Sequence, residues 1–289
     1  MPELPEVETV AGGLRPLLVG TVVTGCDIRF PTVVRYPDPL HFAARLKGRR
    51  VAAVGRRGKY ILIRLDGDVD GDGGGEDPSA PAGDLLVVHL GMTGELRKVE
   101  SGAPEPDHLH AVFALDDGHE LRYRDPRRFG RLLLGNAEEL VREGKMPRLG
   151  PEPLDPHFTP ADLYRRLHHR RAPLKAILLD QRVVAGVGNI YADESCFLAR
   201  IRPDRSAASL SRQAVGRLRQ SLEAVLGEAI ANGGSTVASY RDAFGKPGQQ
   251  QERLLVYGRA GEPCPRCGRP LSQTRLAGRT TVFCRRCQR

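Results

Sequence analysis

The chain has 289 residues, a length that predicts two domains of average size, and its 44 Lys and Arg residues exceed its 35 Asp and Glu residues, for a formal net charge of +9. It has no run of about 18 apolar residues and no basic and apolar leader at its N-terminus, so we expect a cytoplasmic protein without a membrane span. Residues 250–289 contain nine arginines and only two glutamates, which predicts a polyanionic partner, with nucleic acid as the first candidate.

The first residues of the chain predict a nucleophile. Removal of Met1 would leave the secondary amine of Pro2 as the α-amino group, beside the carboxylate of Glu3. An α-amino group titrates at roughly pH 8, so a useful fraction is neutral and nucleophilic at physiological pH. A secondary amine that attacks an aldehydic carbon gives an iminium that stays cationic, as Schiff-base chemistry requires. The alternative is that Glu3 and Glu6 are ordinary acids in the first turn of a helix at about residues 5–18.

Residues 21–134 have the pattern of short strands that are bounded by glycine, proline or charged turns. Eight strands are expected, at residues 22–28, 50–54, 60–65, 85–89, 95–99, 110–115, 120–123 and 131–134. This number of short strands predicts an antiparallel sandwich or barrel.

An acidic segment at residues 66–84 interrupts the strand pattern, with seven acidic residues and no basic one. Its Gly- and Asp-rich sequence offers little to pack, so we expect a disordered hairpin insertion. A calcium loop is the alternative, because Asp66, Asp68 and Asp70 alternate and a glycine follows at the sixth position. The aspartate at the twelfth position and the flanking strands argue against an EF-hand.

Helical patterns dominate the rest of the chain. Four helices are expected, at residues 159–167, 173–179, 190–198 and 211–230. Glycines at 186 and 188 precede Asn189 and the third of these helices. A helix, a glycine turn and a second helix can present backbone amides to a phosphate.

Four cysteines form two CxxC pairs separated by a 16-residue spacer, namely Cys264 and Cys267, then Cys284 and Cys287. Four thiolates at this spacing predict a closed tetrahedral zinc site, which is structural because no position is open for catalysis. Disulfides are the alternative, but a reducing compartment disfavours them. Residues 274–283 between the pairs predict a β-hairpin that turns at Gly278.

Several motifs together resemble those of the bacterial formamidopyrimidine-DNA glycosylases, which are base-excision-repair enzymes of the helix-two-turn-helix superfamily. The motifs are PELPEVETV near the N-terminus, DPRRFG at residues 125–130, VGNIYADE at residues 187–194, and VYGR, CPRC, GRTT and CRRCQ near the C-terminus. They occur in the family's order and cover the chain except for the acidic insertion. The resemblance implies an α+β fold, with an N-terminal antiparallel β-sandwich, an N-terminal helix and a C-terminal helix-two-turn-helix domain that ends in a zinc-ribbon β-hairpin.

The resemblance also implies a domain organisation and a set of partners. The implied segments are a catalytic β-sandwich domain at 1–135, a linker at 136–156, a helix-two-turn-helix domain at 157–250 with a lesion-capping loop at 235–250, and a zinc-ribbon finger at 251–289. The implied partner is double-stranded DNA that contains oxidised bases or abasic sites, and the implied cofactor is one structural Zn²⁺. We expect a monomer.

The activity that the resemblance implies is that of a bifunctional DNA glycosylase and AP lyase for oxidised purines, such as 8-oxoguanine and formamidopyrimidines. Pro2 would attack C1′ of the damaged nucleotide, and β- and δ-elimination from the resulting Schiff base would cut the strand. Glu3 and Glu6 would carry protons to and from the sugar. Lys59 and Arg279 match family residues that contact phosphates near the lesion, although either could be an ordinary surface charge.

An enzyme that acts on a base inside a duplex must extrude the nucleotide and fill the gap. Met92, Arg127 and Phe129 match the family's gap-filling residues, because a thioether, a flat cation and a ring can enter a base stack. The other implied DNA contacts are His89, His110, Arg128, Lys175, Asn189 and Tyr240, with Ser239 as a further polar group of the capping loop. The ordinary alternatives are core packing for Met92 and Phe129, a structural role for the histidines, a helix cap for Asn189 and a surface charge for Lys175.

Two competing functions stay open on the sequence. An endonuclease VIII-like enzyme for oxidised pyrimidines belongs to the same superfamily, but that branch usually has glycine where this chain has Leu4. A non-catalytic zinc-ribbon DNA-binding protein would explain the basic charge and the cysteines, but not the N-terminal motif.

Overall fold

The computed structural model describes residues 1–66 and 83–289, which form two compact units. The first unit comprises Met1–Pro2, Glu6–Arg148 and Ser235–Gly248. The second comprises Glu3–Pro5, Leu149–Gly234 and Gln249–Arg289. Almost all of the acidic insertion expected at residues 66–84, and with it the calcium-loop alternative, lies outside the described residues. None of the helices in the described part of the chain is long and apolar enough to cross a membrane.

The first unit is built on two β-sheets, which confirms the expected β-sandwich. Its strands are β1 (Val23–Ile28), β2 (Val34–Tyr36), β3 (Val51–Arg57), β4 (Tyr60–Leu65), β5 (Asp84–His89), β6 (Glu95–Glu100), β7 (Leu109–Leu115), β8 (His119–Arg124) and β9 (Arg131–Gly135). One sheet has the order β1-β7-β8-β6 and the other has the order β2-β9-β5-β4-β3. Neighbouring strands are antiparallel except for the β2–β9 pair. All eight expected strands are present, and β2 is an additional short edge strand.

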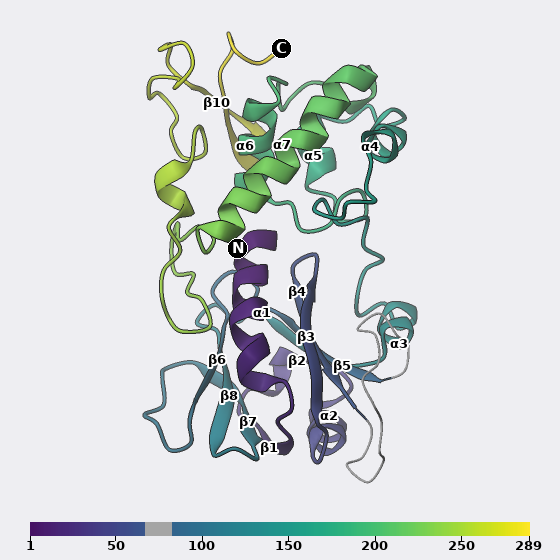
Figure 1. Cartoon of the computed structure of the whole chain (residues 1–289), viewed down its shortest axis with the longest axis vertical. Coiled ribbons are helices and arrows are strands. Elements are labelled where there is room, and N and C mark those ends of the chain that lie inside the picture. The colour runs from purple at the N-terminus through teal and green to yellow at the C-terminus, as the bar shows by residue number, and fades with distance from the viewer. Residues whose placement is uncertain (67–82) are drawn as a thin grey trace. The chain divides into compact units, whose positions relative to one another are not determined.

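The long helix α1 (Leu4–Leu18) lies between the two sheets in Figure 1. Val7, Val10, Leu14 and Leu18 are at most 1% exposed and belong to one core with side chains from both sheets. Their spacing of three to four residues places them on one face of a helix. Burial of each leucine stabilises the unit by roughly 1.5–3 kcal/mol, so this core fixes residues 7–18 of α1 against the sandwich.

Two short helices of the first unit begin at side-chain caps that the sequence analysis did not use. The helix α2 (Pro39–Leu46) follows Asp38, whose carboxylate accepts two backbone N–H bonds of the first turn. The helix α3 (Ala137–Arg142) starts at Asn136, which forms a capping box with Glu139, and it lies in the segment expected to be a linker.

The second unit is helical and carries a β-hairpin. Its elements are α4 (Pro160–Leu167), α5 (Leu174–Leu178), α6 (Asn189–Leu198), α7 (Arg212–Ala231), β10 (Ser272–Leu276) and β11 (Arg279–Phe283). The helix α6 is buried on nearly every side, with only Asn189 and Leu198 half-buried, and α7 packs an apolar stripe into the same core. Ala277 and Gly278 both have positive φ, as a two-residue hairpin turn requires, so the predicted turn at Gly278 is confirmed.

Candidate functional site

Pro2 and Glu6 lie at the buried start of α1 in the first unit. Pro2 is buried, whereas Met1 is 50% exposed. The carboxylate of Glu6 is 1% exposed, and its Oε1 accepts the N–H of Ser235 at 2.7 Å. Glu6 therefore holds the beginning of the segment 235–248, which is distant from it in the sequence.

The segment 235–248 packs against α1 by further contacts. The hydroxyl of Tyr240 donates to the backbone oxygen of Glu6 at 3.2 Å, and the ring is 8% exposed in the core of the first unit. Gly13 of α1 leaves room for Ala243. A Cβ added at position 13 would lie 2.9 Å from the Cβ of Ala243. Tyr240, expected to contact DNA, thus points into the protein and fixes the segment instead.

Glu3 is buried in the second unit and is surrounded by backbone donors. Its carboxylate accepts the N–H groups of Gly188 at 2.8 Å, Ile190 at 2.9 Å and Tyr191 at 3.3 Å. These donors belong to the turn before α6 and to its first residues, where unpaired amides and the helix dipole favour an anion. A side chain at Gly188 would come within 2.3 Å of the Glu3 carboxyl carbon, so this turn is shaped around Glu3.

This geometry corrects the expected role of the glycine turn. The sequence predicted that its amides face a phosphate, but the amides named above bind the Glu3 carboxylate. The first glycine of the turn, Gly186, has φ +83° and its oxygen accepts the N–H of Leu4 at 3.0 Å. The turn therefore fixes the residues that follow Pro2 in the chain.

Asn189 is the first residue of α6 and its side chain is half-buried. Its Oδ1 is buried and, among the described residues, has no hydrogen-bond partner. The backbone N–H groups of Leu255, Val256 and Tyr257 all donate to the carboxylate of Glu194, at 2.8–2.9 Å. Glu194 thus fixes the backbone of residues 255–257 against α6.

Lys175 is in the interior of the second unit, which differs from the expected DNA contact. Its side chain is 0% exposed, and Nζ lies 2.7 Å from Oδ1 of Asp193 and 2.8 Å from the backbone oxygen of Thr280. Direct contact with a phosphate would require this buried ion pair to open. In the described structure the ammonium group of Lys175 has protein partners only.

His110 also differs from the expectation of a phosphate contact. It is 4% exposed, and its Nε2 lies 2.8 Å from the backbone oxygen of Asp125, which it binds as a donor. His89 accepts the N–H of Gly91 at its Nδ1, at 3.1 Å. Burial lowers the pKa of His89 to about 4, and the charges of Arg131 and Lys59 lower it further in the same direction. His89 is therefore a neutral imidazole at physiological pH.

Lys59 occupies the two-residue turn between β3 and β4, after Gly58 with φ +57°. It is 6% exposed, so it is not a solvated charge on a strand edge. A lysine that the fold keeps buried at a turn is better explained by a specific contact than by solubility.

Met92 and the pair Arg127 and Phe129 are presented by two turns of the first unit that touch each other. Met92 is 36% and Phe129 is 52% exposed, and the guanidinium of Arg127 lies 5.0 Å from the centre of the Phe129 ring. Arg128 has positive φ and stacks on Phe30. The described structure thus exposes the expected gap-filling side chains at turn tips, and none of the three belongs to a buried core.

The two turns are joined by the buried carboxylate of Asp125. Its oxygens accept the hydroxyl of Thr93 at 2.5 Å, the N–H of Arg127 at 3.2 Å and the N–H of Gly130 at 2.8 Å. A Cβ on Gly91, which has φ +64°, would lie 2.5 Å from the backbone nitrogen of Gly130. The backbones of the two turns are in contact, so the turns hold Met92 and Phe129 in fixed positions relative to each other.

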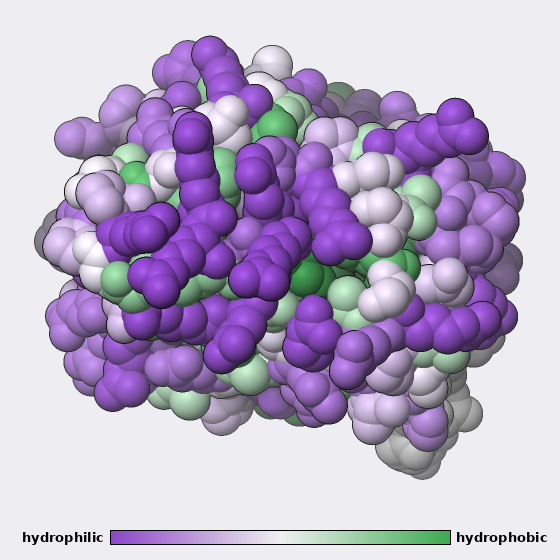
Figure 2. Space-filling view, turned by 90° about the horizontal axis from the view of Figure 1, so that it is seen from above, coloured by the Kyte–Doolittle hydropathy of each residue, from purple (hydrophilic) through white to green (hydrophobic). Residues whose placement is uncertain are grey.

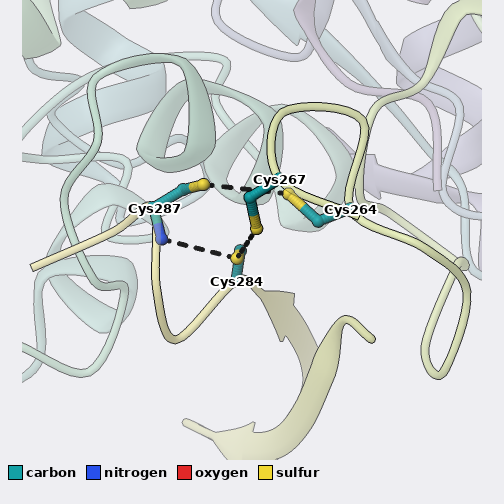
Figure 3. Close-up of side chains that lie close together, drawn as sticks. All are labelled: Cys264, Cys267, Cys284 and Cys287. Atoms are coloured by element: carbon teal, nitrogen blue, oxygen red, sulfur yellow. Dashed lines mark hydrogen bonds between the residues drawn. The ribbon is translucent and has the colours of Figure 1, made fainter. Parts of the chain in front are cut away.

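The four cysteines converge at the base of the β10–β11 hairpin, as Figure 3 shows. Their sulfurs all lie within 4.8 Å of one another, with 3.9 Å between Cys264 and Cys287 and 3.6 Å between Cys267 and Cys284. These separations exclude disulfides, whose sulfurs are about 2.05 Å apart. Sulfurs that each lie about 2.3 Å from a central zinc are about 3.8 Å apart, so the cluster fits a tetrahedral zinc site.

Arginines surround this cluster on the surface of the second unit. Arg279 is exposed beside the hairpin turn, and a hollow next to the cysteines is lined by Arg269, Arg285, Arg286 and Arg289. In the described parts of the chain, none of these five forms an ion pair with a carboxylate. Figure 2 shows protruding hydrophilic side chains over much of the face that it views. The arrangement can bind a polyanion.

Three acidic residues that organise these contacts were not identified as functional from the sequence. Asp125, Asp193 and Glu194 stand inside the motifs DPRRFG and VGNIYADE, which was the available signal. Each is at most 3% exposed. The partners of Asp193 and Glu194, and Thr93 among the partners of Asp125, are distant in the sequence, so only the structure shows these contacts.

Comparison with known families covers most of the chain. The formamidopyrimidine-DNA glycosylase N-terminal domain matches residues 1–132, the formamidopyrimidine-DNA glycosylase H2TH domain matches residues 149–241, and a zinc finger found in FPG and IleRS matches residues 261–289. Proteins called formamidopyrimidine-DNA glycosylase are similar over the full length. The one from Geobacillus kaustophilus is 46% identical over 100% of both chains, and the one from Moorella thermoacetica is 48% identical over 95% of both.

Solved structures give the same result. The MutM (Fpg) protein of Thermus thermophilus is 44% identical, with a TM-score of 0.84 over 99% of this chain and 98% of that chain. Two Lactococcus lactis Fpg structures are each 32% identical. A mutant bound to Fapy-dG-containing DNA has a TM-score of 0.87 over 100% of both chains, and a complex with abasic-site-containing DNA has a TM-score of 0.86 over 99% of both chains.

Proposed function

Because the chain belongs to the formamidopyrimidine-DNA glycosylase family, we propose that it excises oxidised purines from duplex DNA and then cuts the strand as an AP lyase. The observation that carries this proposal is the full-length similarity to relatives of that name, together with a proline at position 2. The similarity to a Lactococcus lactis protein bound to Fapy-dG-containing DNA supports an oxidised purine as the substrate, and the complex with an abasic site supports the lyase step.

The proposed reaction begins when Met1 is removed and the nitrogen of Pro2 attacks C1′ of the damaged nucleotide. The C1′–N bond to the base breaks and the base leaves with a proton. The amine of Pro2 loses its proton, the C1′–O4′ bond breaks and O4′ takes up a proton, so the opened sugar is held as an iminium on Pro2. Loss of a proton from C2′ expels the 3′ phosphate, and a second elimination expels the 5′ phosphate. Water then hydrolyses the Schiff base and frees the amine.

Glu3 and Glu6 have different surroundings, and we assign them different tasks in this reaction. Glu3 is adjacent to Pro2 in the chain, and backbone donors fix its carboxylate, which suits a group that exchanges protons with the sugar. Glu6 is held by Ser235, so it also orders the beginning of the loop at 235–250 that is expected to cap the lesion.

The remaining groups are proposed to bind DNA. Lys59, Asn189 and Arg279 would contact phosphates, and Met92, Arg127 and Phe129 would fill the space left by the extruded nucleotide. Cys264, Cys267, Cys284 and Cys287 would hold one structural Zn²⁺. Bound zinc would stabilise the hairpin that carries Arg279 and would leave no position open for catalysis.

The test compares base release with strand cleavage. A duplex with 8-oxoguanine should lose the free base and show the 3′ and 5′ phosphate ends of β,δ-elimination. Pro2→Gly should lose most of both activities and keep its affinity for DNA with an abasic-site analogue. Preferential release of an oxidised pyrimidine would favour the endonuclease VIII-like function, and DNA binding with neither activity would favour a non-catalytic protein.

A further inference from the structure

The ion pair between Lys175 and Asp193 has no part in the reaction described above. Both side chains are 0% exposed, and 2.7 Å separates Nζ of Lys175 from Oδ1 of Asp193. Lys175 is in α5 and Asp193 is in α6, one turn after Asn189. Two buried charges are costly to remove from water, so this pair needs further hydrogen bonds to be tolerated.

Those further hydrogen bonds go to the backbone of β11. Lys175 Nζ donates to the oxygen of Thr280 at 2.8 Å, and the N–H of Val282 donates to Oδ2 of Asp193 at 3.1 Å. The residue between them, Thr281, is 0% exposed, and its hydroxyl donates to the oxygen of Arg279 at 3.2 Å. The ion pair therefore binds the backbone of β11 at Thr280 and Val282, immediately after Arg279.

The hairpin depends on anchors of this kind because β10 and β11 pair only with each other among the described strands. A two-stranded hairpin by itself is at best marginally stable. The cysteine cluster adjoins the C-terminal end of β11 through Cys284, and the ion pair binds the middle of the strand at Thr280 and Val282, next to Arg279 at its start.

We propose that Lys175 and Asp193 are positioning residues. They fix the position of Arg279 relative to Asn189, so that both side chains can bind the DNA backbone. Asp193 is on the helix that starts with Asn189, and its carboxylate binds the strand that starts with Arg279. The inference rests on the proposed DNA contacts of these two residues. The buried ion pair would thus determine the distance between two groups that are proposed to bind phosphates.

The first test measures the hairpin without DNA. Asp193→Asn keeps an oxygen for the Val282 N–H but loses the charge that pairs with Lys175, and Lys175→Met keeps the length of the side chain without its charge. In the zinc-loaded protein, both variants should exchange the amides of residues 280–282 for deuterium at least about tenfold faster, because the local opening free energy falls. Unchanged exchange in Asp193→Asn, with zinc retained, would overturn the proposal.

The second test asks whether the pair acts through Arg279. In the wild-type background, Asp193→Asn should lower the affinity for a duplex with a tetrahydrofuran abasic-site analogue by about tenfold. In the Arg279→Ala background the same substitution should lower the affinity by much less, because the effects of coupled residues are not additive. Equal losses in both backgrounds would indicate general destabilisation and contradict the positioning role.

Arg219→Met is the matched control for both tests. Arg219 is a comparably buried cation of the same unit, 5% exposed, and it binds the backbone oxygens of Phe158 and Asp155 rather than the hairpin. This variant should leave amide exchange at residues 280–282 and the DNA affinity unchanged. Since neither test requires base excision, a failure of the proposed chemistry would appear only in activity and would be distinguishable.

Discussion

At the scale of single residues, the carboxylate of Glu3 occupies the space that a side chain at position 188 would need. Gly188 has φ −133° and ψ −156°, an extended conformation that alanine also adopts, so only the space taken by Glu3 excludes a side chain there. The close approach lets the amides of the turn bind the carboxylate. A substitution at Gly188 is therefore a test of Glu3 that leaves Glu3 itself intact.

Gly188→Ala should displace the Glu3 carboxylate and break its bonds to the backbone. We expect a loss of about 1–3 kcal/mol in the free energy of unfolding, measured by urea denaturation, together with slower strand cleavage. Gly216→Ala in α7 is the control, because its Cβ meets no atom within 4 Å; it should be stabilising by roughly 0.5–1 kcal/mol. Wild-type stability and cleavage in Gly188→Ala would show that the turn does not depend on Glu3.

His89 provides a prediction about pH. Its pKa of about 4 in the folded protein lies below the usual value near 6.5, because burial and two neighbouring cations disfavour the charged form. The unfolded chain thus binds more protons between these two pH values, so the His89 contribution to stability is complete above pH ~6.5 and is lost as the pH falls toward 4. Imidazole NMR should show His89 titrating near 4. Titration close to 6.5 would mean that the ring is solvated.

At the scale of elements, the turns that carry Met92 and Phe129 depend on Asp125. Thr93→Val removes the hydroxyl that donates to that carboxylate and accepts the N–H of Arg127, with little change of shape. We expect a several-fold weaker fluorescence response from 2-aminopurine placed opposite an abasic site, because the gap-filling side chains are less well held. Thr93→Ser keeps the hydroxyl and should respond like the wild type. An undiminished response in Thr93→Val would show that the two turns are held by other contacts.

The zinc ribbon provides a second prediction at this scale. Cys284→Ser should release zinc and weaken DNA binding, because the hairpin then loses the fixed end that the cysteine cluster provides. Zinc is measured by metal analysis of the purified protein, and affinity by titration of a labelled duplex. Retained zinc with full affinity would contradict the assignment of this cluster.

At the scale of the whole molecule, the fold was predictable where patterns are local. Alternating apolar residues located the eight strands, and the CxxC pairs located the metal cluster. Short β2 and α2 were missed, although Asp38 before Pro39 was a usable helix-start signal. The pairing of Glu3 with residues 188–191 and of Glu6 with Ser235 could not be predicted, because no local preference specifies contacts across 185–229 residues.

Phosphate contacts also predict how the whole molecule responds to salt. The logarithm of the affinity should fall linearly with the logarithm of the salt concentration, and Arg279→Ala should make that slope shallower by about one unit. Arg165→Ala is the control, since Arg165 is exposed and pairs with Asp162 within α4; it should leave the slope unchanged. A flat salt response of the wild type would exclude phosphate contacts as the main source of affinity.

Borohydride trapping tests the central role of Pro2 most directly. The mature protein is incubated with an abasic-site duplex and sodium borohydride, and the covalent product is digested and mapped by mass spectrometry. We predict that Met1 is absent, that the reduced sugar is attached to the nitrogen of Pro2, and that Pro2→Gly sharply reduces the product. A protein that keeps Met1, or an adduct on a lysine that persists in Pro2→Gly, would contradict the account.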